Sequence, residues 1–174
     1  MTRPDRLLNG SILAVQAFRI VNVAALGLFV AALVATIPGA EWVEAALVRK
    51  YGDTVDPGMV VLFMQVTMLL SFPVGYAIER LLATLRALLR TVQEGEPFVA
   101  GNAARIRTIG WMLLVVQVAD LALGGVTAIA HRLHIDFAPW QPGFTGWIAV
   151  LVAFVLAQVF ERGAAMCDDL DGTV

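Results

Sequence analysis

Four long apolar stretches alternate with polar segments along the chain, at residues 16–37, 59–82, 108–130 and 144–165. An α-helix rises about 1.5 Å per residue, so roughly 20 residues cross a hydrocarbon core of about 30 Å. Each stretch is long enough to span a bilayer, and the 174-residue chain leaves little other sequence to bury four such helices. The pattern therefore predicts an all-α integral membrane protein, a four-helix transmembrane bundle that forms a single domain.

The segment between the second and third stretches, residues 79–107, has an amphipathic pattern of its own. Its apolar positions recur at helical spacing on one face, and its arginines lie off that face. The apolar positions are Leu81, Leu82, Leu85, Leu88, Leu89 and Val92, and the arginines are Arg80, Arg86 and Arg90. We expect the second span to continue into a cytoplasmic connector helix that ends at Gly95, and we expect Asn102 to cap the next helix. This connector either lies on the inner leaflet or packs against a partner helix.

Basic residues are distributed unevenly between the two sides of the expected bundle. One side has Arg3, Arg6, Arg19, Arg80, Arg86, Arg90, Arg105, Arg107 and Arg162, and the other has Arg49, Lys50 and Arg132. Cytoplasmic loops carry the excess of Lys and Arg. This distribution predicts that both termini and residues 79–107 are cytoplasmic, and that residues 38–58 and 131–143 are external. In the external segments we expect a short surface helix over 41–51 and interfacial anchoring by Trp42, Trp140 and Trp147.

Composition narrows the functional classes. The chain is 59% hydrophobic and 15% charged, whereas soluble domains have about 25% charged residues. Its net charge of −2 excludes a basic nucleic-acid binder, and its single cysteine excludes an internal disulfide framework. No phosphate-binding glycine loop, nucleophile elbow or helical metalloprotease motif occurs. His131, His134 and Asp136 are too short a pattern to favour a metal. We therefore expect no enzymatic activity, no cofactor and no metal.

Asp120 lies in the middle of the third apolar stretch. A charged residue at that depth costs about 2.5–3.5 kcal/mol on insertion scales, so it should face the bundle interior or be protonated. Gln117 shares its helix face, and Gln65 and Asn22 are the available polar partners on the second and first spans. One interpretation is a hydrogen bond that packs helices together; the other is a proton or cation site. We favour packing.

Two motifs carry a resemblance to a known family. The first is Gly95-Glu96-Pro97-Phe98 followed by Asn102, Arg105, Ile106, Arg107, Ile109 and Gly110; the second is the run 160–166 followed by the acidic tail 168–174. Together with four spans, they resemble an uncharacterised bacterial membrane family, domain of unknown function 2975. Met166-Cys167 departs from the leucine and arginine expected there. The resemblance implies an inner-membrane protein of unknown activity, in a family often encoded beside a small helix-turn-helix regulator of the Cro type.

The functional hypothesis that follows is a regulatory or interaction protein of the bacterial inner membrane. Its partners would be the lipid bilayer, a small cytosolic DNA-binding regulator and other copies of itself, with no direct contact to nucleic acid. The candidate partner-binding residues are Leu85, Leu89, Arg86, Arg90, Pro97, Phe98, Asp168 and Asp169. The alternative is a small transporter or channel subunit in which Asp120 and Gln117 line an oligomeric pathway.

Overall fold

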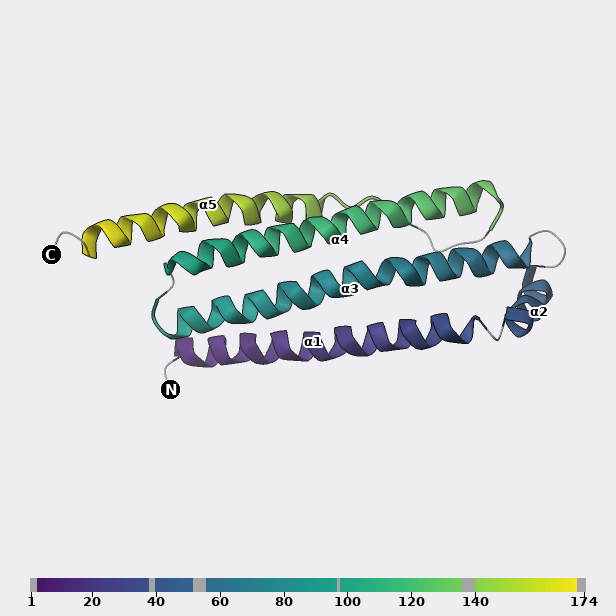
Figure 1. Ribbon diagram of the computed structural model, residues 1–174, viewed down its shortest axis with the longest axis horizontal. Helices are drawn as coiled ribbons and strands as arrows, with labels where there is room; N and C mark the ends of the chain where they lie inside the picture. Colours follow the sequence, from purple (N-terminus) through teal and green to yellow (C-terminus); the bar gives the residue numbers. More distant parts are fainter. Residues whose placement is uncertain (1–2, 38–39, 52–55, 97, 136–139, 172–174) are drawn as a thin grey trace.

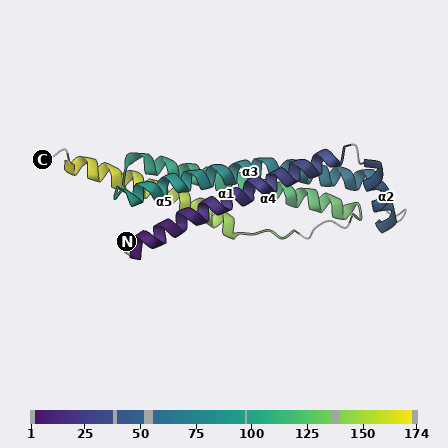
Figure 2. The ribbon, with the colours of Figure 1, turned by 90° about the horizontal axis from the view of Figure 1, so that it is seen from below.

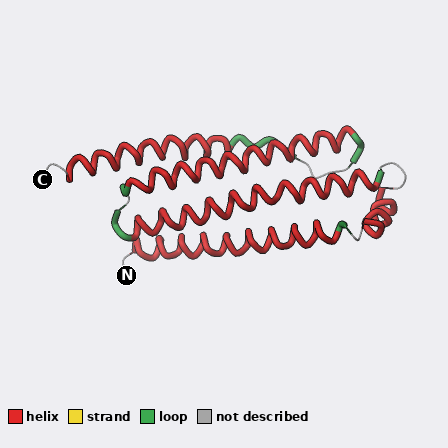
Figure 3. Tube along the Cα trace, in the orientation of Figure 1, coloured by secondary structure: helices red, strands yellow, loops and turns green. Residues whose placement is uncertain are grey.

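A computed structural model describes residues 3–37, 40–51, 56–96, 98–135 and 140–171 of the chain. Within these ranges the protein is helical, without strands, as the apolar pattern predicts (Figure 3). The helices are α1 (Arg3–Ala35), α2 (Ala40–Tyr51), α3 (Pro57–Gln93), α4 (Ala100–Arg132) and α5 (Thr145–Asp171). Four of them, all except α2, are long and apolar enough to cross a membrane. The expected short helix between the first two spans is α2.

The four long helices lie side by side in the order α1, α3, α4, α5 (Figure 1). Each packs on the next, α2 packs on α3, and within the described ranges α1 contacts neither α4 nor α5. Figure 2 shows that α1 crosses the other helices at an angle. The bundle is therefore open, and large apolar side chains such as Leu28, Leu69 and Leu151 are exposed on its outer faces. Such faces are typical of helices surrounded by lipid.

The ends of α1 and α5 that carry the chain termini lie at the same end of the molecule as the α3–α4 turn, which we name the turn end (Figure 1). This arrangement agrees with the expected placement of both termini and the connector on one side. The connector is formed by the last part of α3 and the first part of α4. Helix α3 runs without a break through Pro73 to Gln93.

The α3–α4 turn is closed by a Schellman motif. Gly95 has φ +85°, its N–H donates to the Val92 carbonyl, and the Glu96 N–H donates to the Thr91 carbonyl. Glycine adopts this left-handed conformation without steric cost, so the expected end of the helix at Gly95 is confirmed. The expectation that Asn102 caps α4 is wrong. Val99 holds the cap position, and Asn102, fully buried inside α4, instead donates to the Thr91 hydroxyl over 2.8 Å.

At the other end of α4, His134 takes the position that glycine usually holds. It has φ +59°, and the Ile135 N–H returns to the Ala130 carbonyl over 3.0 Å. This geometry turns Ile135, which is 2% exposed, into a cluster with Val60, Phe63 and Ala130. An apolar contact of this kind commonly accompanies a Schellman turn.

Helix α5 begins part way along α4 and extends past it at the turn end (Figure 1). Contacts between the helices agree: Gly146 near the start of α5 faces Gln117 in the middle of α4, and Glu161 pairs with Arg107. Residues 140–144, which precede α5, are not helical, and the offset of α5 along α4 was not predicted from the sequence. Proline at position 142, which has no N–H to satisfy, suits such an irregular segment.

Candidate functional site

Asp120 lines a cavity of about 280 Å³ between α1, α3 and α4. The lining is mostly apolar and consists of Phe29, Thr67, Leu70, Ser71, Val74, Val116, Ala119, Asp120 and Leu123. The hydroxyl groups of Thr67 and Ser71 donate to carbonyls of their own helix, at Phe63 and Met68. The hydroxyl oxygens of Thr67 and Ser71 can still accept hydrogen bonds. The polar groups that line the cavity are therefore these two hydroxyls and the Asp120 carboxyl.

Trp140 is the hydrogen-bond partner that the structure gives Asp120. Its indole Nε1 donates to Asp120 Oδ1 over 3.2 Å, and its ring lies where a Cβ at Gly124 would be. The expectation that Trp140 anchors at the membrane interface is therefore wrong, because the ring packs on the middle of α4. Gly124 lies one turn after Asp120 and has no side chain, which makes room for the indole. The spacing of four residues between Asp120 and Gly124 was the feature of the sequence that could have predicted a large side chain packed beside Asp120.

The other candidate polar residues are engaged elsewhere. Gln65 Nε2 donates to Thr36 Oγ1 over 3.3 Å, and Asn22 Nδ2 donates to the Gly75 carbonyl over 3.0 Å. Both bonds join α1 to α3. The Gln117 carboxamide occupies the space beside Gly146 on α5. The four candidates therefore do not form one polar cluster; only Asp120 lines the cavity.

The α1–α3 contact ends in an ion pair near the turn end. Arg19 donates through Nε and a terminal nitrogen to Glu79 Oε1, and both side chains are about one-third exposed. The second carboxylate oxygen, Glu79 Oε2, is buried and has no hydrogen-bond partner among the described residues. Arg19 and Glu79 precede and follow the uncharged parts of α1 and α3, so the pair marks a boundary of the apolar region.

Both sequence motifs meet at the turn end. The ring of Phe98, in the α3–α4 turn, packs on Phe160 of α5 with centroids 5.4 Å apart, and it fills the space beside Gly163. Arg107 donates to Glu161 over 2.7 Å. The motif residues therefore fasten the α3–α4 hairpin to α5. These residues belong to the two motifs of the family resemblance, but the sequence did not predict that they contact each other.

A buried hydrogen-bond cluster supports the same turn. The Asn102 amide donates to the Thr91 hydroxyl, and Arg105 donates to Asn102 Oδ1 over 2.7 Å. Buried polar groups require such partners, so the motif positions Asn102 and Arg105 stabilise the hairpin. Thr91 is a member of this cluster that the sequence analysis missed.

The residues expected to bind a partner occupy different environments. Leu85, Leu89 and Arg86 are half-buried along α3, whereas Arg90 and Phe98 are exposed. Pro97 and the side chains of Asp168 and Asp169 lie outside the described parts. The connector leucines are thus partly covered within the chain itself.

Comparison with models of protein families gives a match to a family. The sequence model of a family described as "Protein of unknown function (DUF2975)" matches residues 57–174. The match begins at the first residue of α3 and includes both motifs of the turn end. No curated protein and no solved structure matches the chain.

Proposed function

The chain belongs to the DUF2975 family, and from that premise we propose that it is a non-enzymatic regulatory protein of the bacterial inner membrane. It acts through a cytosolic partner that docks on the turn end. The observation that carries the proposal is a set of exposed apolar side chains near the ends of α3, α4 and α5 at the turn end. We name it the tip patch; its members are Val92, Phe98, Val99 and Met166, with exposed fractions of 37%, 46%, 37% and 68%.

The tip patch differs from the apolar faces of the spans because exposed charged residues lie near its members in the sequence. Arg90, Glu94, Arg107 and Arg162 lie on the same helix ends and are exposed. Lipid contact explains exposed leucines along a span, but it does not explain apolar side chains among charged ones. An apolar patch with a polar rim is typical of a protein interaction site.

Two further arguments support the cytoplasmic location of the turn end and the identity of the partner. The excess of arginine at the turn end favours a cytoplasmic location by the positive-inside rule. The resemblance to the family suggests a small DNA-binding regulator as the partner. Binding would hold that regulator at the membrane and away from DNA.

The test is a double substitution in the tip patch, Val99→Glu with Met166→Glu, in the full-length tagged protein. The small helix-turn-helix regulator that the family resemblance suggests is co-expressed, and its recovery with the protein from detergent is measured. We expect recovery to fall at least about tenfold, because two carboxylates would enter an apolar contact. Val48→Glu is the matched control, since Val48 is 44% exposed on α2, at the opposite end of the molecule. Undiminished recovery of the regulator with the double variant contradicts the proposal.

A second candidate function is transport, and the Asp120 cavity is the observation that favours it. A proton or cation site inside a membrane protein requires an ionisable group beside open space. Asp120 meets this requirement, since it lines a cavity of about 280 Å³ between three helices. The open row of helices would need a second copy to enclose a pathway. Asp120→Asn, reconstituted in vesicles, would abolish flux on this hypothesis while the protein stays folded.

A further inference from the structure

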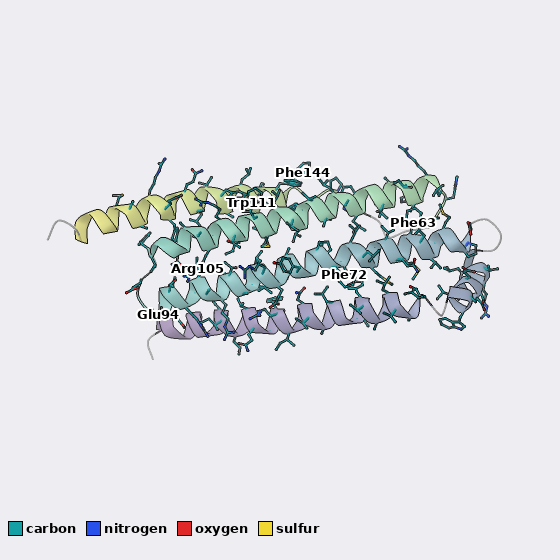
Figure 4. The ribbon with its side chains drawn as sticks, viewed as in Figure 1. Phe63, Phe72, Glu94, Arg105, Trp111 and Phe144 are labelled. Carbon is teal, nitrogen blue, oxygen red and sulfur yellow. The ribbon has the colours of Figure 1, made fainter. Side chains whose placement is uncertain are left out.

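Four arginines from three helices line one cavity of about 400 Å³ at the turn end. They are Arg19 of α1, Arg86 and Arg90 of α3, and Arg105 of α4. Figure 4 labels Arg105 and Glu94 in this part of the molecule. Ala83 and Ala87 also line the cavity, and their short side chains leave the space open between the guanidinium groups. We name it the arginine cavity.

The described side chains neutralise only part of the positive charge of the arginine cavity. Arg19 is paired with Glu79, and Glu94 is the one carboxylate among the lining residues. Within the described side chains, no carboxylate lies within salt-bridge distance of Arg86 or Arg90. The cavity therefore holds an excess of positive charge.

One donor in this region is also unsatisfied. Arg86 Nε is buried and has no hydrogen-bond partner among the described residues. A buried donor without a partner lowers the stability of the fold, and more so when the group is charged. Such groups are rare in folded proteins, and each calls for an explanation such as an unseen acceptor. An anion in the cavity would supply that acceptor.

The position of the cavity indicates what kind of anion fits. Arg19 lies directly before the uncharged part of α1, so the cavity is at the depth where the apolar surface begins. Beside it, a groove of about 440 Å³ shares Arg19 and is also lined by Ile20, Val23 and Ala24. This groove leads from the charged groups onto apolar surface of α1. A charged head with an apolar chain would match both parts.

We propose that the arginine cavity binds a phosphate group, carried either by an anionic phospholipid or by a free phosphate compound. Guanidinium groups donate paired hydrogen bonds to phosphate oxygens, in a geometry that lysine does not offer. Arg86 and Arg90 would make these bonds, and Arg105 would add charge from α4. The cavity shares Arg90 and Glu94 with the charged surroundings of the tip patch, but none of the four tip-patch residues lines it. Phosphate binding does not require the proposed regulator.

The experiment measures ligand-dependent thermal stability of the purified full-length protein in a neutral detergent. The probes are phosphatidylglycerol, phosphatidylcholine and inorganic phosphate, each titrated separately. We expect phosphatidylglycerol to stabilise the protein and the zwitterionic phosphatidylcholine not to do so. The Arg86→Gln, Arg90→Gln double variant should weaken phosphatidylglycerol binding at least about tenfold, since charged hydrogen bonds are lost. Arg162→Gln is the matched control, because Arg162 is exposed at the same end but does not line the cavity.

The outcomes separate the two sources of phosphate. Stabilisation by phosphatidylglycerol alone assigns the site to a lipid headgroup, and stabilisation by inorganic phosphate as well assigns it to free phosphate compounds. Equal stabilisation by phosphatidylcholine, no stabilisation by either phosphate probe, or equal losses in Arg162→Gln and the double variant would overturn the proposal. If the double variant does not fold, Arg90→Gln alone is used, because this exposed side chain has no packing role. Normal lipid binding by the tip-patch variant would show that the two sites are independent.

Discussion

The α1–α3 and α4–α5 contacts join neighbouring helices by different means. Between α1 and α3 lie the Arg19–Glu79 ion pair and the side-chain hydrogen bonds of Asn22 and Gln65. Between α4 and α5 several buried residues are small, and Ala153 and Ala157 are 7% and 1% exposed. Gly110 of α4 faces Phe154 and Ala153, and Trp111 meets Phe154 edge-on with centroids 5.4 Å apart. Within the apolar parts of the helices, polar bonds distinguish the first contact and close packing the second. Each contact also has some of the other element, because Gly75 accommodates Leu26 of α1 and Arg107 pairs with Glu161 of α5.

The difference reflects how helices associate in lipid. Lipid tails are as apolar as leucine, so helices gain little by hiding leucines from lipid and associate through close packing and hydrogen bonds. Small residues bring two backbones together along their length. Isolated polar bonds fix the register of a helix that has little other contact. Helix α1 packs on α3 alone among the long helices, and it lies outside the residues that match the family.

The largest expected effect is from filling the close-packed contact. Ala157→Leu adds three carbons at a position that is 1% exposed, and overpacking of this kind costs about 1–3 kcal/mol. The free energy of unfolding, measured by SDS titration in mixed micelles, should fall by that amount. Ala149→Leu is the matched control, because Ala149 is two helical turns earlier and exposed. Equal losses from both substitutions would show that the α4–α5 contact is not tightly packed.

A smaller effect is expected from the polar contact. Asn22→Leu removes the bond to the Gly75 carbonyl, and an interhelical hydrogen bond in a membrane is worth about 0.6 kcal/mol. The same titration should show a loss of that size. Disulfide cross-linking should show that α1 moves while the α4–α5 contact is kept. Val23→Leu, at an exposed neighbouring position, serves as control. A loss as large as that of Ala157→Leu would contradict the comparison.

The smallest effect is expected at Asp120. Asp120→Asn retains an oxygen that accepts from Trp140 Nε1, so the unfolding free energy should change little. Asp120→Leu removes the acceptor and should cost about 0.6 kcal/mol. Tryptophan fluorescence should report an altered Trp140 environment in the leucine variant alone. A folded Asp120→Asn protein that has lost all function would instead favour the transport hypothesis.

The sequence predicted the parts of this fold that depend on local pattern. Apolar runs predicted the four spans, the leucine periodicity predicted the continuation of α3, and Gly95 predicted its end. These features follow from helix length and from backbone conformations that one residue type favours. His134 escaped prediction because it adopts at the end of α4 a conformation that usually needs glycine.

The candidate site was predicted less completely, because it depends on contacts between distant segments. The charge of Asp120 in an apolar stretch made it conspicuous, yet its partner Trp140 was assigned to the membrane interface. Asn22 and Gln65 were expected as partners for Asp120, but they bond instead to the Gly75 carbonyl and the Thr36 hydroxyl.

By itself, the sequence determined that this chain is an all-α membrane protein of four spans with Asp120 inside the third. Hydrophobic length and the cost of buried charge suffice for those conclusions, since both are properties of single segments. The tertiary structure alone decided that the helices form an open row and that α5 is offset along α4. It also brought Arg19 together with Arg86, Arg90 and Arg105 from two other helices. In lipid, apolar helices have no general preference for one neighbour, so small residues and matched polar groups select the pairing.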